Sequence, residues 1–196
     1  MKLAFAVLVG LTMFGATPVA ALGQITIFGD STGKGDGALV RWHHRLVDAL
    51  ADGREIENAS ASRLPMSRIL HRMEETPDLG QLTIIYDRRN AGETVEEYLE
   101  HLHEAADLIG HERFLILPQV PVSGGREDGT TLPILLSING RILEEFADNT
   151  FDAGQQQDFL DALSGDQTRS DRIHRNDVGQ QIEADFIARW IEEKGY

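Results

Sequence analysis

The feature that most constrains the fold is the alternation of short apolar runs with segments of helical periodicity along the 196-residue chain. Short runs of β-branched and other apolar residues predict buried strands at 24–28, 55–56, 82–86 and 114–117. Apolar residues at helical spacing predict helices at 38–50, 66–73, 94–109, 132–146 and 178–191. Strands that alternate with helices are typical of a parallel sheet covered on both faces. The sequence therefore predicts one α/β domain, a three-layer α/β/α sandwich whose parallel sheet has about five strands.

The ends of these elements and the loops between them carry their own signals. Thr94 and Glu97 form a capping box at the start of the 94–109 helix, and Asn176 or Asp177 is expected to cap the last helix. A glycine-rich loop is expected at 32–37, a long loop at 118–129, and a short strand or turn near 149–151. Because ligands bind beyond the carboxyl ends of parallel strands, chemistry is expected in the loops after the strands and before the last helix.

The first 21 residues have the pattern of a cleaved signal peptide. Lys2 supplies a basic start, 3–15 is an almost unbroken apolar run, and Val19–Ala21 offers small side chains for cleavage. The apolar run is short for a bilayer span, which needs about 20 residues. The chain is therefore expected to divide into a signal peptide at 1–21 and a domain at 22–196, and to be secreted or periplasmic.

The charge balance limits the partners of the chain. It carries 32 acidic residues against 18 lysines and arginines, a net charge of −14, and loss of Lys2 with the signal peptide makes this −15. Such a surface repels phosphate backbones and anionic lipid headgroups. Nucleic acid and membranes are therefore poor partner candidates, and polyanionic substrates are disfavoured unless a local basic patch overrides the field. Solubility alone would explain the charge equally well.

The chain has no cysteine. Disulfides, a thiolate nucleophile and Cys-ligated zinc are therefore excluded. The seven histidines match no zinc-binding pattern of the H-E-x-x-H type. Neither a metal nor a cofactor is expected.

Gly29–Gly33 (GDSTG) follows the first predicted strand, and three interpretations of it fail on context. The nucleophile elbow of α/β-hydrolases lies deep in a larger sheet, after several strands rather than after the first. A chymotrypsin-like GDSGG loop needs its serine late in an all-β chain, after the histidine and the aspartate. A phosphate loop needs G-x-x-x-x-G-K-[ST], whereas Gly29–Lys34 is one residue short and continues with Gly35.

A second motif near the other end of the chain supplies a fourth interpretation. Asp171–His174 (DRIH) opens the run DRIHRNDVGQ at the start of the last predicted helix. A GDS after the first strand, combined with D-x-x-H before the last helix, resembles the SGNH (GDSL-like) hydrolases, and the resemblance covers the mature chain from end to end. It implies the SGNH, flavodoxin-like form of the α/β/α sandwich. It also implies a serine esterase with Ser31, Asp171 and His174 as its catalytic residues.

The chemistry of these three residues suits that role. A serine hydroxyl needs a neighbouring imidazole to take its proton, and the imidazole needs a carboxylate to fix its tautomer. Asp171 and His174 are three residues apart, so the carboxylate can reach the ring. Ser31 would meet them because the loops at the carboxyl edge of a parallel sheet lie together. The alternative for Asp171 and His174 is an ordinary helix cap with a surface histidine.

The SGNH resemblance also implies an oxyanion hole with three donors. The first is the amide of Ser31, and the second is the amide of Ser60, which stands in the glycine position of the family's N-x-G block. The third block is expected as G-x-N-D, but the chain reads Tyr86–Glu93 (YDRRNAGE). Asn90 is the candidate for the third donor, and an asparagine in an ordinary turn is the alternative.

Three further residues are candidates for contact with the substrate. Asp30 precedes Ser31, and Arg88 and Arg89 follow the third predicted strand. The two arginines could bind an acidic or polar substrate; equally, they could be solvated charges that balance the acidic surface. Trp42 and Trp190 are expected to be core residues.

The sequence thus predicts a serine esterase that hydrolyses a small carboxylic ester, such as an O-acetyl group on a carbohydrate, through an acyl-enzyme on Ser31. The expected partner is a small-molecule or carbohydrate ester, with no nucleic acid and no stable membrane anchor. Two alternatives stay open. One is an acyltransferase on the same fold, and the other is a non-catalytic binding module that has lost the oxyanion asparagine.

Overall fold

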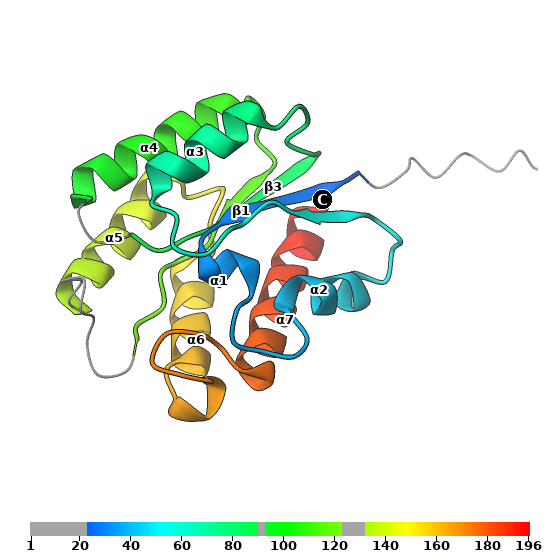
Figure 1. The fold of residues 1–196 in the computed structure, drawn as a ribbon, viewed down its shortest axis with the longest axis vertical. Helices are drawn as coiled ribbons and strands as arrows, with labels where there is room; N and C mark the ends of the chain where they lie inside the picture. Colours follow the sequence, from blue (N-terminus) through cyan, green and yellow to red (C-terminus); the bar gives the residue numbers. More distant parts are fainter. Residues whose placement is uncertain (1–22, 90–92, 123–131) are drawn as a thin grey trace, which may run out of the picture.

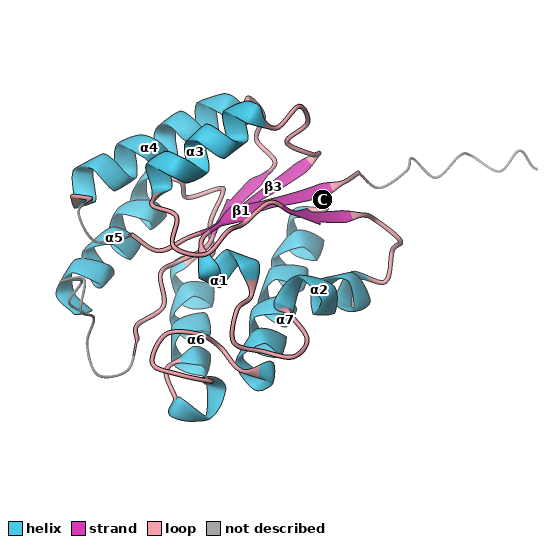
Figure 2. Ribbon diagram, viewed as in Figure 1, coloured by secondary structure: helices cyan, strands magenta, loops and turns pink. Residues whose placement is uncertain are grey.

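The computed structural model describes residues 23–89, 93–122 and 132–196. Its centre is a parallel sheet in the order β2-β1-β3-β4 (Figures 1 and 2). The strands are β1 (Ile25–Gly29), β2 (Ile56–Asn58), β3 (Leu82–Tyr86) and β4 (Phe114–Ile116). The predicted α/β/α architecture is confirmed, and the described residues form four strands of the about five expected.

Helices cover both faces of the sheet, as Figure 1 shows. One face is covered by α2 (Trp42–Leu50), α6 (Ala153–Leu163) and α7 (Asp177–Lys194). The other is covered by α3 (Met66–Glu75), α4 (Val95–Ile109) and α5 (Leu132–Glu145). The two remaining elements are short: α1 (Ser31–Lys34) and a 3-10 turn, η1 (Asp166–Thr168).

The strands are apolar on both sides because each face of the sheet meets a helical layer. In β3, Ile84 and Tyr86 belong to the core beneath α2, α6 and α7, whereas Ile85 belongs to the core beneath α3, α4 and α5. Trp42 and Trp190 are buried in the first of these cores, as predicted.

Most predicted elements are confirmed. The strand at 82–86 has the predicted bounds, and Thr94 and Glu97 form the predicted capping box of α4. Asn176 rather than Asp177 caps α7, because its side-chain oxygen accepts from the amides of Val178 and Gly179.

Two element predictions are corrected by the structure, and one helix was missed. The helix predicted from residue 38 begins at Trp42, and Leu39, whose side chain was counted in the apolar pattern, is 95% exposed. The first residues of the predicted loop at 32–37 are helical, in α1. Of the strand or turn expected near 149–151, the structure has the turn, with bends at 149–150, and Ile116 N donates to Asn149 O. Helix α6 was not predicted, since its apolar stripe is narrow, yet a capping box of Asp152 and Gln155 marks its start.

Two predictions lie partly or wholly outside the described residues. The signal peptide at 1–21 is one, and the long loop is the other, because 123–131 is not described. Within the described ranges, no helix is long and apolar enough to cross a membrane.

Candidate active site

Ser31 begins the short helix α1 directly after β1. Asp30 caps this helix, its carboxylate accepting from Thr32 N at 2.7 Å, and contact of Asp30 with a substrate stays a prediction. A Cβ atom on Gly33 would lie 2.6 Å from Tyr86 O, and one on Gly29 would overlap the same oxygen. The two glycines therefore let α1 lie directly against the end of β3.

Ser31 meets both residues of the distal motif. His174 Nε2 lies 3.1 Å from Ser31 Oγ, and His174 Nδ1 lies 2.8 Å from Asp171 Oδ2. The backbone amides of Ile173 and His174 both donate to Asp171 Oδ1, at 2.6 Å each. This carboxylate is therefore held within its own turn, with its second oxygen directed at the imidazole.

The environment of Asp171 keeps it ionised. Partial burial acts to raise its pKa, but the hydrogen bonds from the His174 ring and from the two backbone amides lower the pKa to about 2. An ionised carboxylate at Nδ1 fixes the imidazole proton on that nitrogen and leaves Nε2 with a lone pair facing Ser31.

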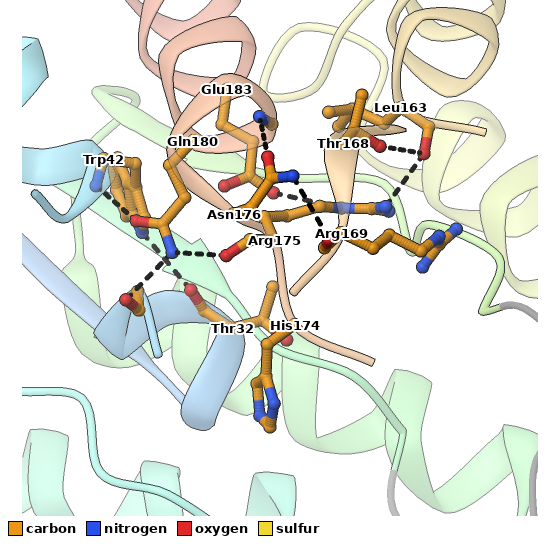
Figure 3. A network of polar contacts seen from close by, with 12 residues as sticks. Thr32, Trp42, Leu163, Thr168, Arg169, His174, Arg175, Asn176, Gln180 and Glu183 are labelled. Carbon is orange, nitrogen blue, oxygen red and sulfur yellow. Dashed lines mark hydrogen bonds and ion pairs between the residues drawn. The ribbon is translucent and has the colours of Figure 1, made fainter. Parts of the chain in front are cut away.

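The segment Ser170–Asn176, called here the acid–base loop, is stabilised from its ends (Figure 3). Ser170 N donates to His174 O at 3.1 Å, which closes the loop on itself. Asn176 Nδ2 donates to Arg169 O at 3.1 Å, and the Arg175 guanidinium donates to Leu163 O at 2.8 Å. The loop is thus bound both to α7 and to the end of α6.

Gln180 connects the acid–base loop to the segment that carries Ser31 (Figure 3). Its side-chain oxygen accepts from Trp42 N at 2.6 Å, and its Nε2 lies within hydrogen-bond distance of Gly35 O at 2.9 Å and Arg175 O at 3.3 Å. It is 1% exposed. No sequence motif pointed to Gln180, because its partner Trp42 is 138 residues away.

A buried carboxylate lies beneath the acid–base loop. Tyr86 Oη donates to Glu183 Oε1 at 2.6 Å, and Arg175 Nε lies 3.7 Å from the same oxygen. Burial raises the pKa of Glu183 to about 7, although the tyrosine hydrogen bond and nearby arginines act to lower it. This pair was not predicted from the sequence.

The two arginines after β3 are both buried. Arg88 is 4% exposed and donates to Thr32 Oγ1 at 3.1 Å and to Ile173 O at 3.4 Å. Arg89 is 8% exposed and donates to Glu93 O. The alternative of solvated surface charges is therefore wrong. Arg88 instead connects the Ser31 helix to the acid–base loop.

The segment 58–64, from the last residue of β2 onward, is called here the oxyanion loop because the sequence predicts an oxyanion donor in it, and its hydrogen bonds differ from that prediction. The amide of Ser60, the predicted donor, donates to Asn58 Oδ1 at 3.0 Å. The Ala61 amide donates to Gly29 O at 3.0 Å. The amides of Ser62 and Arg63, in contrast, have no hydrogen bond to a described residue, and neither does that of Ser31.

Arg63 has a left-handed backbone, with φ of 66°. An L-residue with a side chain adopts this conformation at a cost, and such strain is concentrated at functional sites. The loop is held at the Ser31 helix by Ser62, whose hydroxyl donates to Asp36 Oδ2 at 2.5 Å and lies 3.2 Å from Lys34 Nζ. Asn90, the other predicted oxyanion donor, lies outside the described residues.

Two histidines of α4, His101 and His103, each lie close to one carboxylate. Glu93 lies 2.8 Å from His101, and Glu145 lies 2.7 Å from His103. Among the described residues, no group of three or more histidine, aspartate or glutamate side chains is arranged to hold a metal ion.

The comparisons with known proteins bear on the fold. No protein-family model matches the chain. Among curated proteins, the tail spike protein of Salmonella phage epsilon15 is 23% identical over 139 residues, which is 58% of this chain and 13% of that protein. The chain thus spans only a small part of the length of this relative.

Solved structures match over most of the chain. The lipase/acylhydrolase from Enterococcus faecalis superposes with a TM-score of 0.69 at 17% identity, covering 87% of this chain and 96% of that one. A GDSL-like lipase from Bacteroides thetaiotaomicron has a TM-score of 0.66 at 15% identity, covering 87% and 88%. A Geobacillus acetyl-xylooligosaccharide esterase has a TM-score of 0.65 at 18% identity, covering 86% and 93%. The chain therefore has the fold of the GDSL-like hydrolases, and the SGNH resemblance is confirmed at the level of the fold.

Proposed function

We propose that this protein is a serine hydrolase of carboxylic esters, with Ser31 as the nucleophile. The observation that carries the proposal is the continuous contact from Asp171 through His174 to Ser31, at 2.8 and 3.1 Å. A histidine within hydrogen-bond distance of a serine, and itself oriented by a carboxylate, is the arrangement that activates a hydroxyl. The fold of GDSL-like lipases and acylhydrolases supports the same reaction class.

The proposed reaction has two half-reactions. His174 Nε2 takes the proton of Ser31 as Oγ attacks the acyl carbon, and the imidazolium that forms is stabilised by the Asp171 carboxylate. Collapse of the tetrahedral intermediate breaks the ester bond, and the imidazolium gives its proton to the leaving alcohol. A water molecule that loses its proton to His174 then attacks the acyl carbon of the acyl-enzyme. Collapse of this second intermediate breaks the bond to Ser31 Oγ, the imidazolium returns its proton to Oγ, and the acid is released.

The developing oxyanion needs hydrogen-bond donors that are not already used. Among the described residues, the Ser31 amide has no partner, and within the oxyanion loop neither do the amides of Ser62 and Arg63, whereas that of Ser60 donates to Asn58. We therefore assign the first donor to Ser31 and the second to the turn at Ser62 and Arg63. Asn90 stays the candidate for the third donor.

The proposed substrate is a small ester, with an O-acetyl group on a carbohydrate as the specific candidate. Support comes from two structures of the same fold, which are described as an acetyl xylan esterase and an acetyl-xylooligosaccharide esterase. The strongly negative charge of the chain disfavours polyanionic substrates. We also propose that residues 1–21 are a cleaved signal peptide, and that the enzyme acts in the periplasm or outside the cell.

The contact between Ser31 and His174 argues against the alternative of a non-catalytic binding module. The acyltransferase alternative shares the acyl-enzyme and differs in the acceptor. A product analysis in the presence of sugar acceptors separates the two, because a transferase would yield acylated sugar faster than free acid.

The test is hydrolysis of p-nitrophenyl acetate and of acetylated xylo-oligosaccharides by the protein from Leu22 onward, beside Ser31→Ala. We expect turnover that falls by at least about 10³-fold in the variant, since only oxyanion and binding effects remain. Well-folded protein with no turnover on any ester from pH 6 to 9 would contradict the proposal. Turnover of p-nitrophenyl acetate alone would restrict the substrate to simple esters.

A further inference from the structure

The helix that carries Ser31 is too short to define its own position. It has four residues, and the carbonyl groups of Thr32 and Gly33 are bound from outside. Trp42 Nε1 lies 3.0 Å from Gly33 O and 3.3 Å from Thr32 O, while Asn58 Nδ2 donates to Gly33 O at 3.0 Å. The place of Ser31 relative to the oxyanion loop therefore depends on side chains of other elements.

Asn58 is the side chain that joins the two segments. Its Oδ1 accepts from Ser60 N in the oxyanion loop, and its Nδ2 donates to Gly33 O in the Ser31 helix. Both partners are backbone groups whose donor and acceptor roles are fixed. A flipped amide would oppose oxygen to oxygen and N–H to N–H, so only one orientation of Asn58 satisfies them.

The second hydrogen of Asn58 Nδ2 has a single nearby acceptor among the described residues, His43 Nδ1, at 2.9 Å. Because Nδ2 can only donate, His43 Nδ1 must carry a lone pair, which puts the ring proton on Nε2. His43 is 7% exposed on α2, with its ring nearly perpendicular to that of Trp42 and its ring centroid 4.3 Å from that of His44. The contact is therefore part-buried, with His43 the more buried of its two partners.

The charge state of His43 agrees with this geometry. Burial, together with the neighbouring charges of His44 and Arg41, lowers the pKa of His43 to about 4. The ring is therefore neutral near pH 7 and able to accept.

We propose that His43 is a positioning residue, which accepts from Asn58 and thereby fixes the amide that holds the Ser31 helix at a constant distance from the oxyanion loop. This inference rests on the proposed function and adds a residue that takes no part in the acid–base chemistry. Loss of the acceptor leaves an N–H of the half-buried Asn58 amide without its partner, so Asn58 would rotate to another partner and release Gly33 O or Ser60 N.

The activity test compares three variants. His43→Leu removes the acceptor and keeps an apolar side chain, whereas His43→Asn places a carbonyl oxygen near the position of Nδ1. For p-nitrophenyl acetate, we expect His43→Leu to lower kcat about 10- to 100-fold with KM within about twofold, and His43→Asn to stay within about threefold of wild type. Asp48→Asn, at an exposed position of the same helix, is the matched control and should keep wild-type kcat.

A measurement independent of activity keeps this test separate from the proposed function. The ¹⁵N chemical shifts of the His43 ring should report a lone pair on Nδ1 and a proton on Nε2 at pH 7. A proton on Nδ1 would overturn the inference even in an active enzyme. An unchanged kcat in His43→Leu would overturn it too, and so would an equal loss in both His43 variants, which would indicate simple packing. An inactive wild type with the expected ring shifts would contradict the proposed function and leave the hydrogen bond established.

Discussion

The acid–base loop and the oxyanion loop flank the same serine, but they are built in different ways. The acid–base loop is organised by neighbours in sequence: Asp171 binds the amides of Ile173 and His174 and the His174 ring within four residues. The oxyanion loop is organised by distant residues, since Asn58 binds Gly33 and His43, 25 and 15 positions away.

This difference explains which half of the site a sequence motif can identify. A locally closed turn leaves a fixed spacing, so D-x-x-H was recognisable without a structure. A loop held by distant partners leaves no such spacing. Its hydrogen bonds decide which amides stay available for an oxyanion, and here they engage the amide of Ser60, which the motif had indicated.

The largest expected effect on activity comes from a change in the acid–base loop, the part of the site that is organised by neighbours in sequence. Asp171→Asn keeps an oxygen for the amides of Ile173 and His174, but presents an N–H to the imidazole and so stabilises the wrong tautomer. We expect kcat to fall about 10⁴-fold. The melting temperature should change little. Steady-state kinetics and thermal unfolding check both parts. A kcat within tenfold of wild type would mean that Asp171 does not orient His174.

A change where α1 meets β3 and the oxyanion loop should lower both the stability and the activity. A Cβ atom in Gly33→Ala would lie 2.6 Å from Tyr86 O and 2.9 Å from Ser60 Oγ, so α1 must move away from both β3 and the oxyanion loop. We expect a loss of about 3 kcal/mol in the free energy of unfolding, together with a fall in kcat.

The control for this variant is Gly140→Ala in α5, where a Cβ atom meets nothing within 4 Å. It should raise stability by about 0.5–1 kcal/mol, because alanine favours a helix. Urea unfolding of wild type and of both variants measures these changes in the free energy of unfolding. Equal stability of Gly33→Ala and wild type would show that α1 can shift without cost.

The buried carboxylate beneath the acid–base loop predicts a pH dependence. Native Glu183 keeps its proton up to about pH 7, whereas the unfolded chain releases it near the ordinary value of 4.5. Between these values the native state binds more protons, so this group makes stability fall as pH rises through that window.

Glu183→Gln should remove that fall. Between pH 5 and pH 8, we expect the free energy of unfolding of wild type to fall by about 2 kcal/mol more than that of the variant. Exposed Glu104→Gln is the control and should leave the pH profile of stability unchanged. Parallel profiles for wild type and Glu183→Gln in urea unfolding from pH 4.5 to 8 would contradict the raised pKa.

The smallest expected effect sharpens the assignment of the oxyanion donor. Arg63→Gly relieves a left-handed backbone and keeps the N–H, so we expect a gain of about 0.5–1 kcal/mol in stability with kcat within about twofold of wild type. Ala51→Gly, at the other described non-glycine residue with positive φ, should give a similar gain and leave kcat alone. A large loss of kcat only in Arg63→Gly would assign a role to the Arg63 side chain instead.

The sequence by itself determined the alternation of strands and helices, the bounds of the 82–86 strand, the capping box of Thr94, and the two motifs around Ser31 and His174. These features depend on residues close together in the chain, whose periodicity and spacing are direct consequences of local geometry.

Only the tertiary structure decided the rest. In the fold, Arg88 is buried between the Ser31 helix and the acid–base loop. Gln180 accepts a hydrogen bond from Trp42 N, and the amide of Ser60 donates to Asn58. A buried polar group must find a partner wherever the fold supplies one, and in a parallel sheet that partner comes from loops far apart in sequence. The motif around Ser31, the proposed nucleophile, was therefore predictable from the order of residues, whereas the groups that hold this serine in place were set by packing.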